Sequence, residues 1–153
     1  MLRQVPSAFG SDYESAAQLT VDDFRQRVQN DADNFITGAF SDSTLIGSCG
    51  GRRDPAAKRR HIGYVWGMYL QPKFRGTGLS RQLLDTTLIK LRQLPGLELI
   101  QLAVTAGNTA AENLYLKAGF RDYGIEPAAL KIGEQAYDER LMWLPIRKDQ
   151  HLT

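Results

Sequence analysis

The hydrophobic period changes near the middle of the chain, and this change constrains the fold more than any other feature. The segment Ile62–Leu70 is apolar at almost every position, which is typical of a strand buried in the middle of a sheet. From Leu79 to Leu94, leucines recur at steps of three to five residues, the pattern of an amphipathic helix, and Pro95 and Gly96 then end it. The sequence therefore predicts a buried strand that passes through a glycine turn into a long helix.

The other segments predict a mixed α/β fold of the α+β kind. Strict alternation along 62–70 is expected to place Tyr64, Trp66 and Met68 on one face of their strand. No repeat or linker divides the 153 residues, so we expect a single domain over residues 1–153. The remaining expected elements are a helix from Thr20 to about Val28, hairpin strands Phe35–Phe40 and Thr44–Cys49, a basic surface loop Arg52–Arg60, a strand Leu97–Thr105, a helix Asn108–Ala118, and strands Phe120–Ile125 and Gln135–Leu144.

Composition excludes several classes of protein. Nineteen Lys and Arg against seventeen Asp and Glu leave a net charge of +2, which argues against a nucleic-acid partner. No segment approaches the ~20 apolar residues of a membrane span, so we expect no membrane partner and a cytoplasmic location. The single cysteine, Cys49, can form neither an internal disulfide nor a Cys/His metal cluster. We expect it to be a small buried hydrophobe and the site to hold no metal.

The junction between the central strand and the long helix has the features of an anion site. Gly76 and Gly78 let the backbone approach a ligand, and the first N–H groups of a helix lack internal partners. The helix dipole adds positive potential, and Lys73, Arg75 and Arg81 add formal charge. These features predict binding of a phosphate-bearing ligand.

Two common phosphate-binding motifs are excluded at this junction. A nucleoside triphosphate loop requires Lys and then Ser or Thr after the last glycine, whereas Gly78 is followed by Leu79. A dinucleotide fingerprint requires a third glycine where Arg81 stands. A short diphosphate cradle remains, and coenzyme A carries such a diphosphate.

The residues of this junction, together with later segments, resemble the GNAT family of N-acetyltransferases. Lys73–Gly78 looks like the family's acyl-CoA signature Q/R-x-x-G-x-G/A, with Lys73 in place of the usual Gln or Arg. The segment from Val104 through Phe120 is similar to the family's second conserved block. Ala8–Glu14 and the end of the chain resemble a bacterial branch of small acetyltransferases. Only eight residues precede Phe9, so the family's first strand is expected to be missing.

The resemblance implies a mostly antiparallel central sheet flanked by helices, with acetyl-CoA as the cosubstrate. Backbone groups at residues 68–70 would hold the pantetheine arm, residues 75–80 the diphosphate, and Asn108 the pantetheine amide. Tyr115 would lie near the sulfur and act as the catalytic acid, because a phenol of pKa ~10 can protonate a departing thiolate. The full set of expected cofactor-binding residues is Met68, Tyr69, Leu70, Lys73, Arg75, Gly76, Thr77, Gly78, Leu79, Ser80, Arg81, Asn108, Ala111 and Tyr115.

The implied reaction is direct transfer of acetyl to a primary amine, expected on a small molecule, within a ternary complex. The general base stays open among Glu14, His61, Asp138 and Glu139. Two alternatives also stay open. One is acetylation of a protein or peptide amine, and the other is a non-catalytic acyl-CoA-binding regulatory module. A missing edge strand leaves a homodimer open as well.

Overall fold

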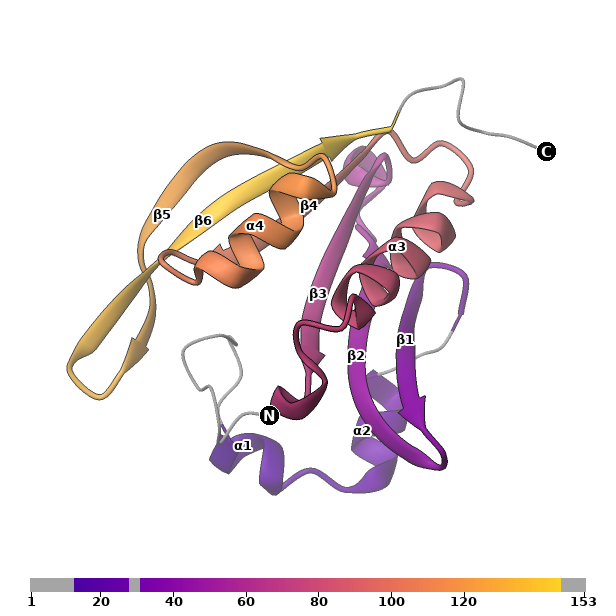
Figure 1. The fold of residues 1–153 in the computed structure, drawn as a ribbon. Coiled ribbons are helices and arrows are strands. Elements are labelled where there is room, and N and C mark those ends of the chain that lie inside the picture. Colours follow the sequence, from indigo (N-terminus) through magenta and orange to yellow (C-terminus); the bar gives the residue numbers. More distant parts are fainter. Residues whose placement is uncertain (1–12, 28–30, 147–153) are drawn as a thin grey trace.

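The computed structural model describes residues 13–27 and 31–146 and contains one six-stranded sheet (Figure 1). Only β3 and β4 pair in parallel, and the other neighbouring strands are antiparallel. The expected mixed, mostly antiparallel sheet is therefore confirmed. The strands are β1 (Asn34–Ser41), β2 (Thr44–Arg53), β3 (Ile62–Leu70), β4 (Leu99–Thr105), β5 (Arg121–Ile132) and β6 (Gln135–Pro145), in the order β1-β2-β3-β4-β6-β5.

The two longer helices, α3 (Leu79–Arg92) and α4 (Thr109–Lys117), cover the same face of the sheet (Figure 1). The leucine stripe of α3 is buried against β1, β2 and β3, as its period predicts. Tyr115 and Phe120 extend the same core beneath α4. Two shorter helices, α1 (Tyr13–Ala17) and α2 (Val21–Arg27), precede the sheet, and 3₁₀ turns η2 (Ala57–Arg59) and η3 (Pro72–Phe74) flank β3.

The sheet splits between its two central strands. β3 and β4 pair only where Ile62–Tyr64 meets Leu99–Gln101, although both strands continue for several residues. β4 pairs with β6 as far as Thr105, so β4 stays with the half of the sheet that contains β5 and β6. Consequently β3 and β4 diverge after Tyr64 and no longer pair with each other.

A bulge in β3 reverses the side-chain alternation that the sequence predicted. Gly67 has φ of +59°, and the pairing register with β2 shifts between Ser48 and Gly50. Met68 packs against the core under the helices, whereas Trp66 packs over Gly50 on the opposite face. The expectation that Tyr64, Trp66 and Met68 share a face is therefore wrong, because one extra residue moves Met68 to the other side.

Several boundaries also differ from expectation. β2 continues through Arg53, so the expected basic loop begins later than Arg52 and holds the turn η2. β5 continues past Pro127 to Ile132, with a register shift between Glu126 and Leu130. An edge strand tolerates proline because one side of its backbone has no partner strand. The helix α1 was not expected.

The capping of α2 is confirmed in detail. The Thr20 hydroxyl accepts from the Asp23 backbone N–H at 3.1 Å, and the Asp23 carboxylate accepts from the Thr20 N–H at 2.7 Å. The expected absence of a first strand, the resemblance over most of Ala8–Glu14, and the tail after residue 146 lie outside the described residues. Within residues 13–27 and 31–146, no helix is both long and apolar enough to cross a membrane.

Candidate functional site

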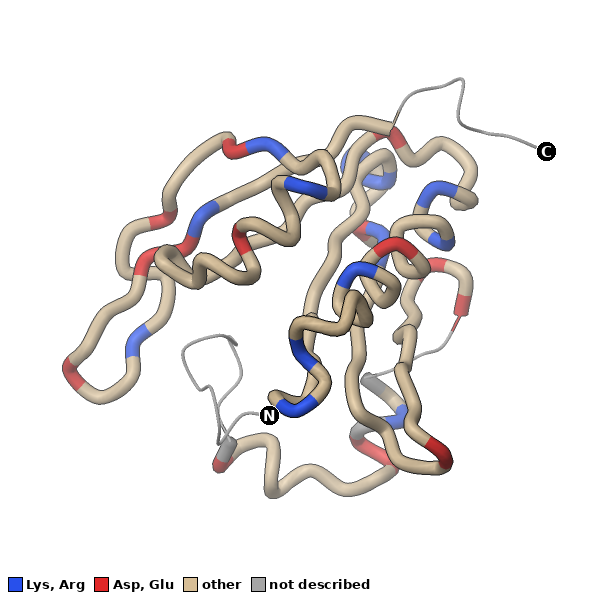
Figure 2. Tube along the Cα trace, in the orientation of Figure 1, with Lys and Arg blue, Asp and Glu red and all other residues tan. Residues whose placement is uncertain are grey.

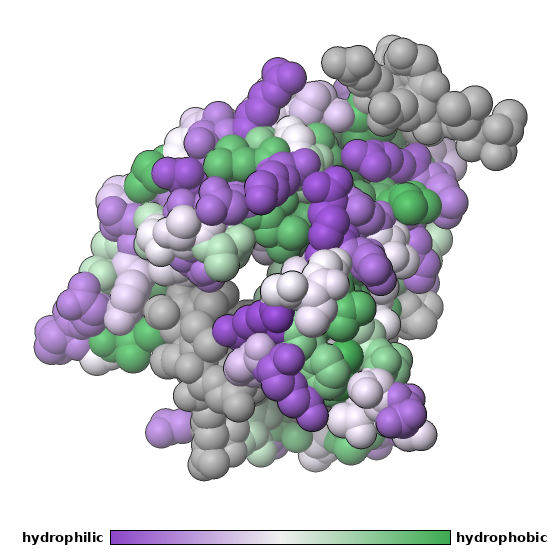
Figure 3. Space-filling view, in the orientation of Figure 1, coloured by the Kyte–Doolittle hydropathy of each residue, from purple (hydrophilic) through white to green (hydrophobic). Residues whose placement is uncertain are grey.

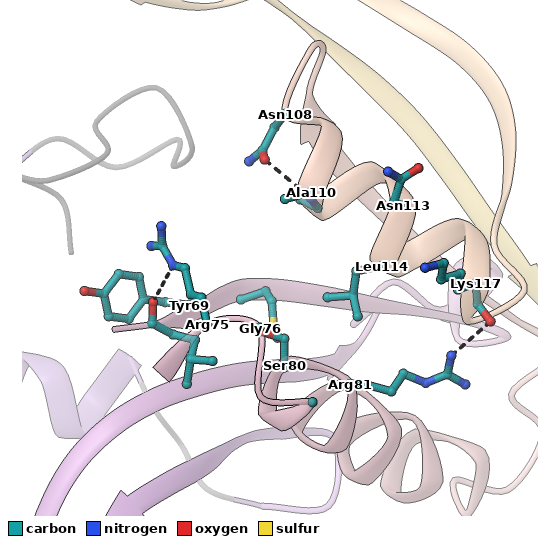
Figure 4. A pocket seen from close by; sticks show the side chains of 14 residues that line it. Tyr69, Arg75, Gly76, Ser80, Arg81, Asn108, Ala110, Asn113, Leu114 and Lys117 are labelled. Atoms are coloured by element: carbon teal, nitrogen blue, oxygen red, sulfur yellow. Dashed lines mark hydrogen bonds between the residues drawn. The ribbon is translucent and has the colours of Figure 1, made fainter. Parts of the chain in front are cut away.

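A cavity of about 490 Å³ lies on the helix side of the split in the sheet (Figures 3 and 4). The end of β3 and the turn into α3 form one wall, and α4 forms the other. Its lining residues are Met68, Tyr69, Leu70, Arg75, Gly76, Gly78, Ser80, Arg81, Asn108, Ala110, Ala111, Asn113, Leu114 and Lys117. The two sequence blocks that resembled GNAT motifs thus meet across one hollow.

The turn before α3 requires its glycines for their backbone conformation. Gly76 has φ of +75° and Gly78 has φ of +84°, a region that costs an L residue roughly 1–2 kcal/mol. In the described part of the chain, no side chain caps the helix at Gly78, so the first N–H groups of α3 can bind an anion. A Cβ built at either glycine meets nothing within 4 Å, because both positions border open space.

Basic residues occur along the chain on both sides of this turn (Figure 2). Arg75 donates from Nε to the Leu70 carbonyl oxygen at 3.0 Å, which leaves its terminal nitrogens available. Arg81 instead binds the Asp85 carboxylate and donates to the Lys117 carbonyl oxygen at 3.0 Å. Arg81 therefore joins α3 to α4, and Arg75 and Lys117 supply the more available positive charge.

The wall formed by α4 depends on the cap at its N-terminus. The Asn108 side-chain oxygen accepts from the Ala111 N–H at 3.4 Å, so its amide N–H₂ remains free to donate toward the cavity. Glu112 accepts from the Gly107 N–H at 2.9 Å and completes the cap.

Four residues of α4 line the cavity but were not expected from the sequence: Ala110, Asn113, Leu114 and Lys117. Their spacing of three, four and seven residues marks one helix face and is the signal that could have found them.

Four expected cofactor-binding residues do not line the cavity. The Lys73 amine lies 4.8 Å from the centre of the Phe74 ring. The Thr77 hydroxyl donates to the Phe74 carbonyl oxygen, and Leu79 packs against the core. The fourth residue, Tyr115, is 6% exposed.

Tyr115 is a residue of α4, the helix that lines the cavity, and its side chain is buried in the core. Its ring meets Phe120 edge-on, with 5.9 Å between ring centres. Burial raises the pKa of the Tyr115 hydroxyl, and the negative charge of an ionised Cys49 would raise it further. Cys49 is itself fully buried, and burial raises its pKa to about 11 against the lowering effect of a hydrogen bond with Thr87. Both groups therefore keep their protons at neutral pH.

A second cavity of about 330 Å³ lies on the opposite face of the sheet. Its position follows from the pleat, because Leu102 and Val104 face the core while Ala103 between them faces away. The lining residues are Arg52, Tyr64, Val65, Trp66, Gly67, Gln101, Leu102, Ala103, Tyr123, Glu139 and Leu141. Gly67 borders this cavity and the adjacent Met68 borders the first, so the two hollows approach the split in the sheet from opposite faces.

The candidate bases differ sharply in position. Glu14 lies exposed on α1, and Asp138 accepts from the Ala128 N–H at 2.8 Å. His61 precedes β3, and its carbonyl oxygen accepts from the N–H groups of Glu98 and Leu99. Glu139 is half-buried and is the one of these four that lines either cavity. Burial raises the pKa of Glu139, and the negative charge of Glu126 adds to that rise.

Comparisons with known proteins agree with this geometry. The model of the Acetyltransferase (GNAT) family matches residues 2–120. A mycothiol acetyltransferase of Geodermatophilus obscurus is 32% identical over 130 residues, which are 82% of this chain and 41% of that protein. The chain thus spans less than half the length of this relative.

Solved structures share the fold. A GNAT acetyltransferase from Streptococcus pneumoniae superposes with a TM-score of 0.76 at 26% identity, over 84% of this chain and 79% of that one. Salmonella typhimurium yncA, solved with its cofactor acetyl-CoA, gives a TM-score of 0.73 at 18% identity, over 92% and 80% of the two chains. The split sheet, the glycine turn and the match over residues 2–120 lead to one conclusion, that the chain belongs to the GNAT family of acetyltransferases.

Proposed function

We propose that the chain is a single N-acetyltransferase domain that transfers acetyl from acetyl-CoA to the primary amine of a small molecule. The observation that carries this proposal is that two cavities approach the split between β3 and β4 from opposite faces of the sheet. Each substrate has its own face of the sheet, so both can be bound at once. This arrangement supports direct transfer within a ternary complex.

The first cavity fits the chemistry of the acyl carrier. A diphosphate would lie at the N-terminus of α3, near the N–H groups that follow Gly78 and the guanidinium of Arg75. The pantetheine amides would bind backbone groups at residues 68–70, where β3 is no longer paired with β4, and the side-chain amide of Asn108. The thioester would then lie beside Gly67 and Met68, where the second cavity begins.

The transfer needs few groups from the protein. The amine nitrogen attacks the thioester carbonyl, forming a C–N bond, and the C–S bond then breaks. Glu139 would accept a proton from the amine, directly or through water, and Tyr115 would donate a proton to the leaving thiolate. A backbone N–H near the bulge would stabilise the oxyanion. Holding the amine and the thioester in the reacting orientation can lower the activation free energy by ~7–11 kcal/mol.

The position of Cys49 argues against a covalent acyl-enzyme. Its side chain is fully buried in the core, and its pKa of about 11 keeps the thiol protonated. Since the thiolate is the nucleophilic form, Cys49 is unsuited to accept the acetyl group. Direct attack by the amine remains.

The test is release of free CoA thiol from acetyl-CoA across a panel of small primary amines and short peptides, for wild type and Tyr115→Phe. We expect turnover with small amines and intersecting lines in initial-rate plots. The variant should bind acetyl-CoA normally but turn over more slowly. Turnover with peptides alone would refute the small-molecule acceptor. Binding of acetyl-CoA with no thiol release for any acceptor would indicate the regulatory module.

A further inference from the structure

We propose that the second cavity selects an acceptor with a primary amine and an acidic group at opposite ends of a flat apolar body, Glu139 binding the amine and Arg52 the acid. This inference rests on the proposed function and specifies its substrate class. It depends on the walls of the cavity, on the positions of its charges, and on the absence of an acidic partner for Arg52 among the described residues.

The walls of the cavity are aromatic and its floor is small. Ala103 of β4 leaves the floor hollow, with Tyr64 and Trp66 of β3 on one side and Tyr123 of β5 on the other. Trp66 is 37% exposed and Tyr123 is 51% exposed, so both rings offer uncovered surface. Flat apolar bodies are the shape that such rings bind best.

Tyr64 is held rigidly in its wall. Its hydroxyl donates to the Asp54 carboxylate at 2.8 Å and accepts from the Arg59 guanidinium. The Arg52 guanidinium lies 4.3 Å from the centre of the same ring. A wall fixed in advance loses little side-chain entropy when a ligand binds.

The charges of the cavity lie at its two ends. Arg52 pairs across β2 and β3 with Tyr64, which is level with Gln101 of β4. Glu139 is level with Thr105, four residues farther along β4, which is about 13 Å along the strand direction, and Arg52 on β2 and Glu139 on β6 lie on opposite sides of the β3–β4 pair. Ala103 lies midway between these two levels and next to the expected transfer point. A molecule lying over Ala103 can therefore meet a positive group at one end and a negative group at the other.

The negative end is suited to an ammonium group. Glu139 and Glu126 face each other directly on β6 and β5. The half-buried carboxylate of Glu139 and the exposed carboxylate of Glu126 repel each other, and a cation between them relieves that repulsion. Burial, the larger cause of the raised pKa of Glu139, also makes this carboxylate a better proton acceptor than an exposed one.

At the positive end, Arg52 has no acidic partner among the residues that the structure describes. Of the arginines in this stretch, Arg53 and Arg60 pair with Asp33, and Arg59 pairs with Asp54. Within the described part of the chain, no carboxylate forms an ion pair with Arg52. Its charge is thus available to a carboxylate of the acceptor, and it disfavours acceptors with a second ammonium group at that end.

The experiment uses three matched amines, 4-(aminomethyl)benzoate, 4-(aminomethyl)benzamide and benzylamine, with thiol release from acetyl-CoA as the readout. Wild type should prefer the benzoate to the benzamide by about tenfold in kcat/KM, the effect of one charge-assisted contact. Arg52→Met, which keeps an apolar chain over Tyr64, should abolish that preference, so that kcat/KM for the benzoate falls to about the value for the benzamide. Arg60→Met, which removes a basic residue paired elsewhere, is the matched control and should keep it. A wild type without the preference, or a preference that survives Arg52→Met, would overturn the role of Arg52.

A second pair of variants tests the amine end. Glu139→Gln should reduce kcat/KM for all three amines by about tenfold or more, with the KM for acetyl-CoA unchanged. The control is Glu134→Gln, in the exposed turn of the same hairpin. Equal rates for Glu139→Gln and wild type would remove Glu139 from the amine site.

A binding measurement separates this inference from the proposed function. Trp66 lines the second cavity, so its fluorescence should change when the benzoate is titrated into the CoA-bound protein, and Trp66→Phe should lose that change. If other amines release thiol while these three neither react nor alter the fluorescence, the inference fails and the proposed function stands. If no amine or peptide releases thiol, the proposed function fails, and the titration still decides whether the cavity takes this class of molecule.

Discussion

At the residue scale, Asp54 organises one wall of the second cavity. Its side chain accepts hydrogen bonds from the Arg59 guanidinium, the Tyr64 hydroxyl and the Ala56 N–H. These contacts, led by the one from Arg59, lower the pKa of the Asp54 carboxyl from 3.8 to about 2. The ionised form is therefore the form that the fold stabilises.

This shift predicts how the stability contribution of Asp54 depends on pH. Because the folded pKa lies below the unfolded pKa, the contribution is complete above pH ~4–5 and is lost as pH falls toward 2. We expect Asp54→Asn to melt below wild type at pH 7, and the difference in Tm to shrink steadily between pH 5 and 2.5. Thermal melts of both proteins across this range provide the measurement. A difference that stays constant with pH would show that the carboxylate charge is not what stabilises the wall.

Cys49 gives a second prediction at this scale. In the folded protein it should resist thiol reagents at pH 8, because it is fully buried and its pKa is about 11. It should react rapidly once guanidinium unfolds the chain. Mass spectrometry after brief exposure to acetyl-CoA should find no acetyl group on Cys49, and Cys49→Ala should retain turnover. An acetylated Cys49 that transfers its acetyl group to an amine would contradict direct transfer.

At the scale of the element, the bulge in β3 determines which residues reach each cavity. Gly67 has φ of +59°, and a Cβ there would meet nothing within 4 Å. Gly67→Ala should therefore destabilise the protein by about 1–2 kcal/mol through backbone strain alone. If the strand relaxes to ordinary alternation, Met68 leaves the first cavity. We expect a large loss of thiol release, measured beside the free energy of unfolding.

The chain contains a matched control for this variant. Gly133, in the turn between β5 and β6, has φ of +57° and the same open surroundings. Gly133→Ala should lose a similar amount of stability but keep thiol release near the wild-type rate. Equal activity losses in the two variants would mean that strain lowers activity globally, without a specific role for the bulge.

The elements that the sequence predicted well are those with a strong period of their own. The leucine-rich helix α3 and the strand β4 after it could be located because the spacing of their apolar residues along the chain marks the face that is buried. The bulge at Gly67 could not be located, since a glycine in a strand can adopt either a negative or a positive φ and the sequence alone does not distinguish the two. The continuation of β5 past Pro127 depends on its place at the sheet edge, which is a property of the whole topology.

The same distinction separates the two cavities. The first could be predicted in large part, because the turn at Gly76 and Gly78 and the cap at Asn108 are each local motifs. The second draws one or more residues from each of β2, β3, β4, β5 and β6, and no local pattern joins them. Only the register of the sheet brings Arg52, Tyr123 and Glu139 around Ala103.

At the scale of the whole molecule, the two halves of the sheet share one hydrophobic core but only a short strand pairing. β3 and β4 share a short parallel pairing, and the bond from Arg81 to the Lys117 carbonyl oxygen links α3 to α4. A ligand seated between β3 and α4 would therefore contact both halves at once. Since such a site exists only in the folded protein, binding must add to its stability.

Acetyl-CoA should thus raise the melting temperature of the protein. At a ligand concentration 100 times Kd, the gain is about 2.7 kcal/mol, or roughly 5–10 °C for a chain of this size. Acetyl-pantetheine at the same concentration lacks the diphosphate and should give a much smaller rise, because the turn before α3 contributes nothing to its binding. Arg75→Met should reduce the rise with acetyl-CoA and leave the rise with acetyl-pantetheine unchanged. Equal rises in melting temperature for the two compounds in wild type would show that the diphosphate does not bind at the N-terminus of α3.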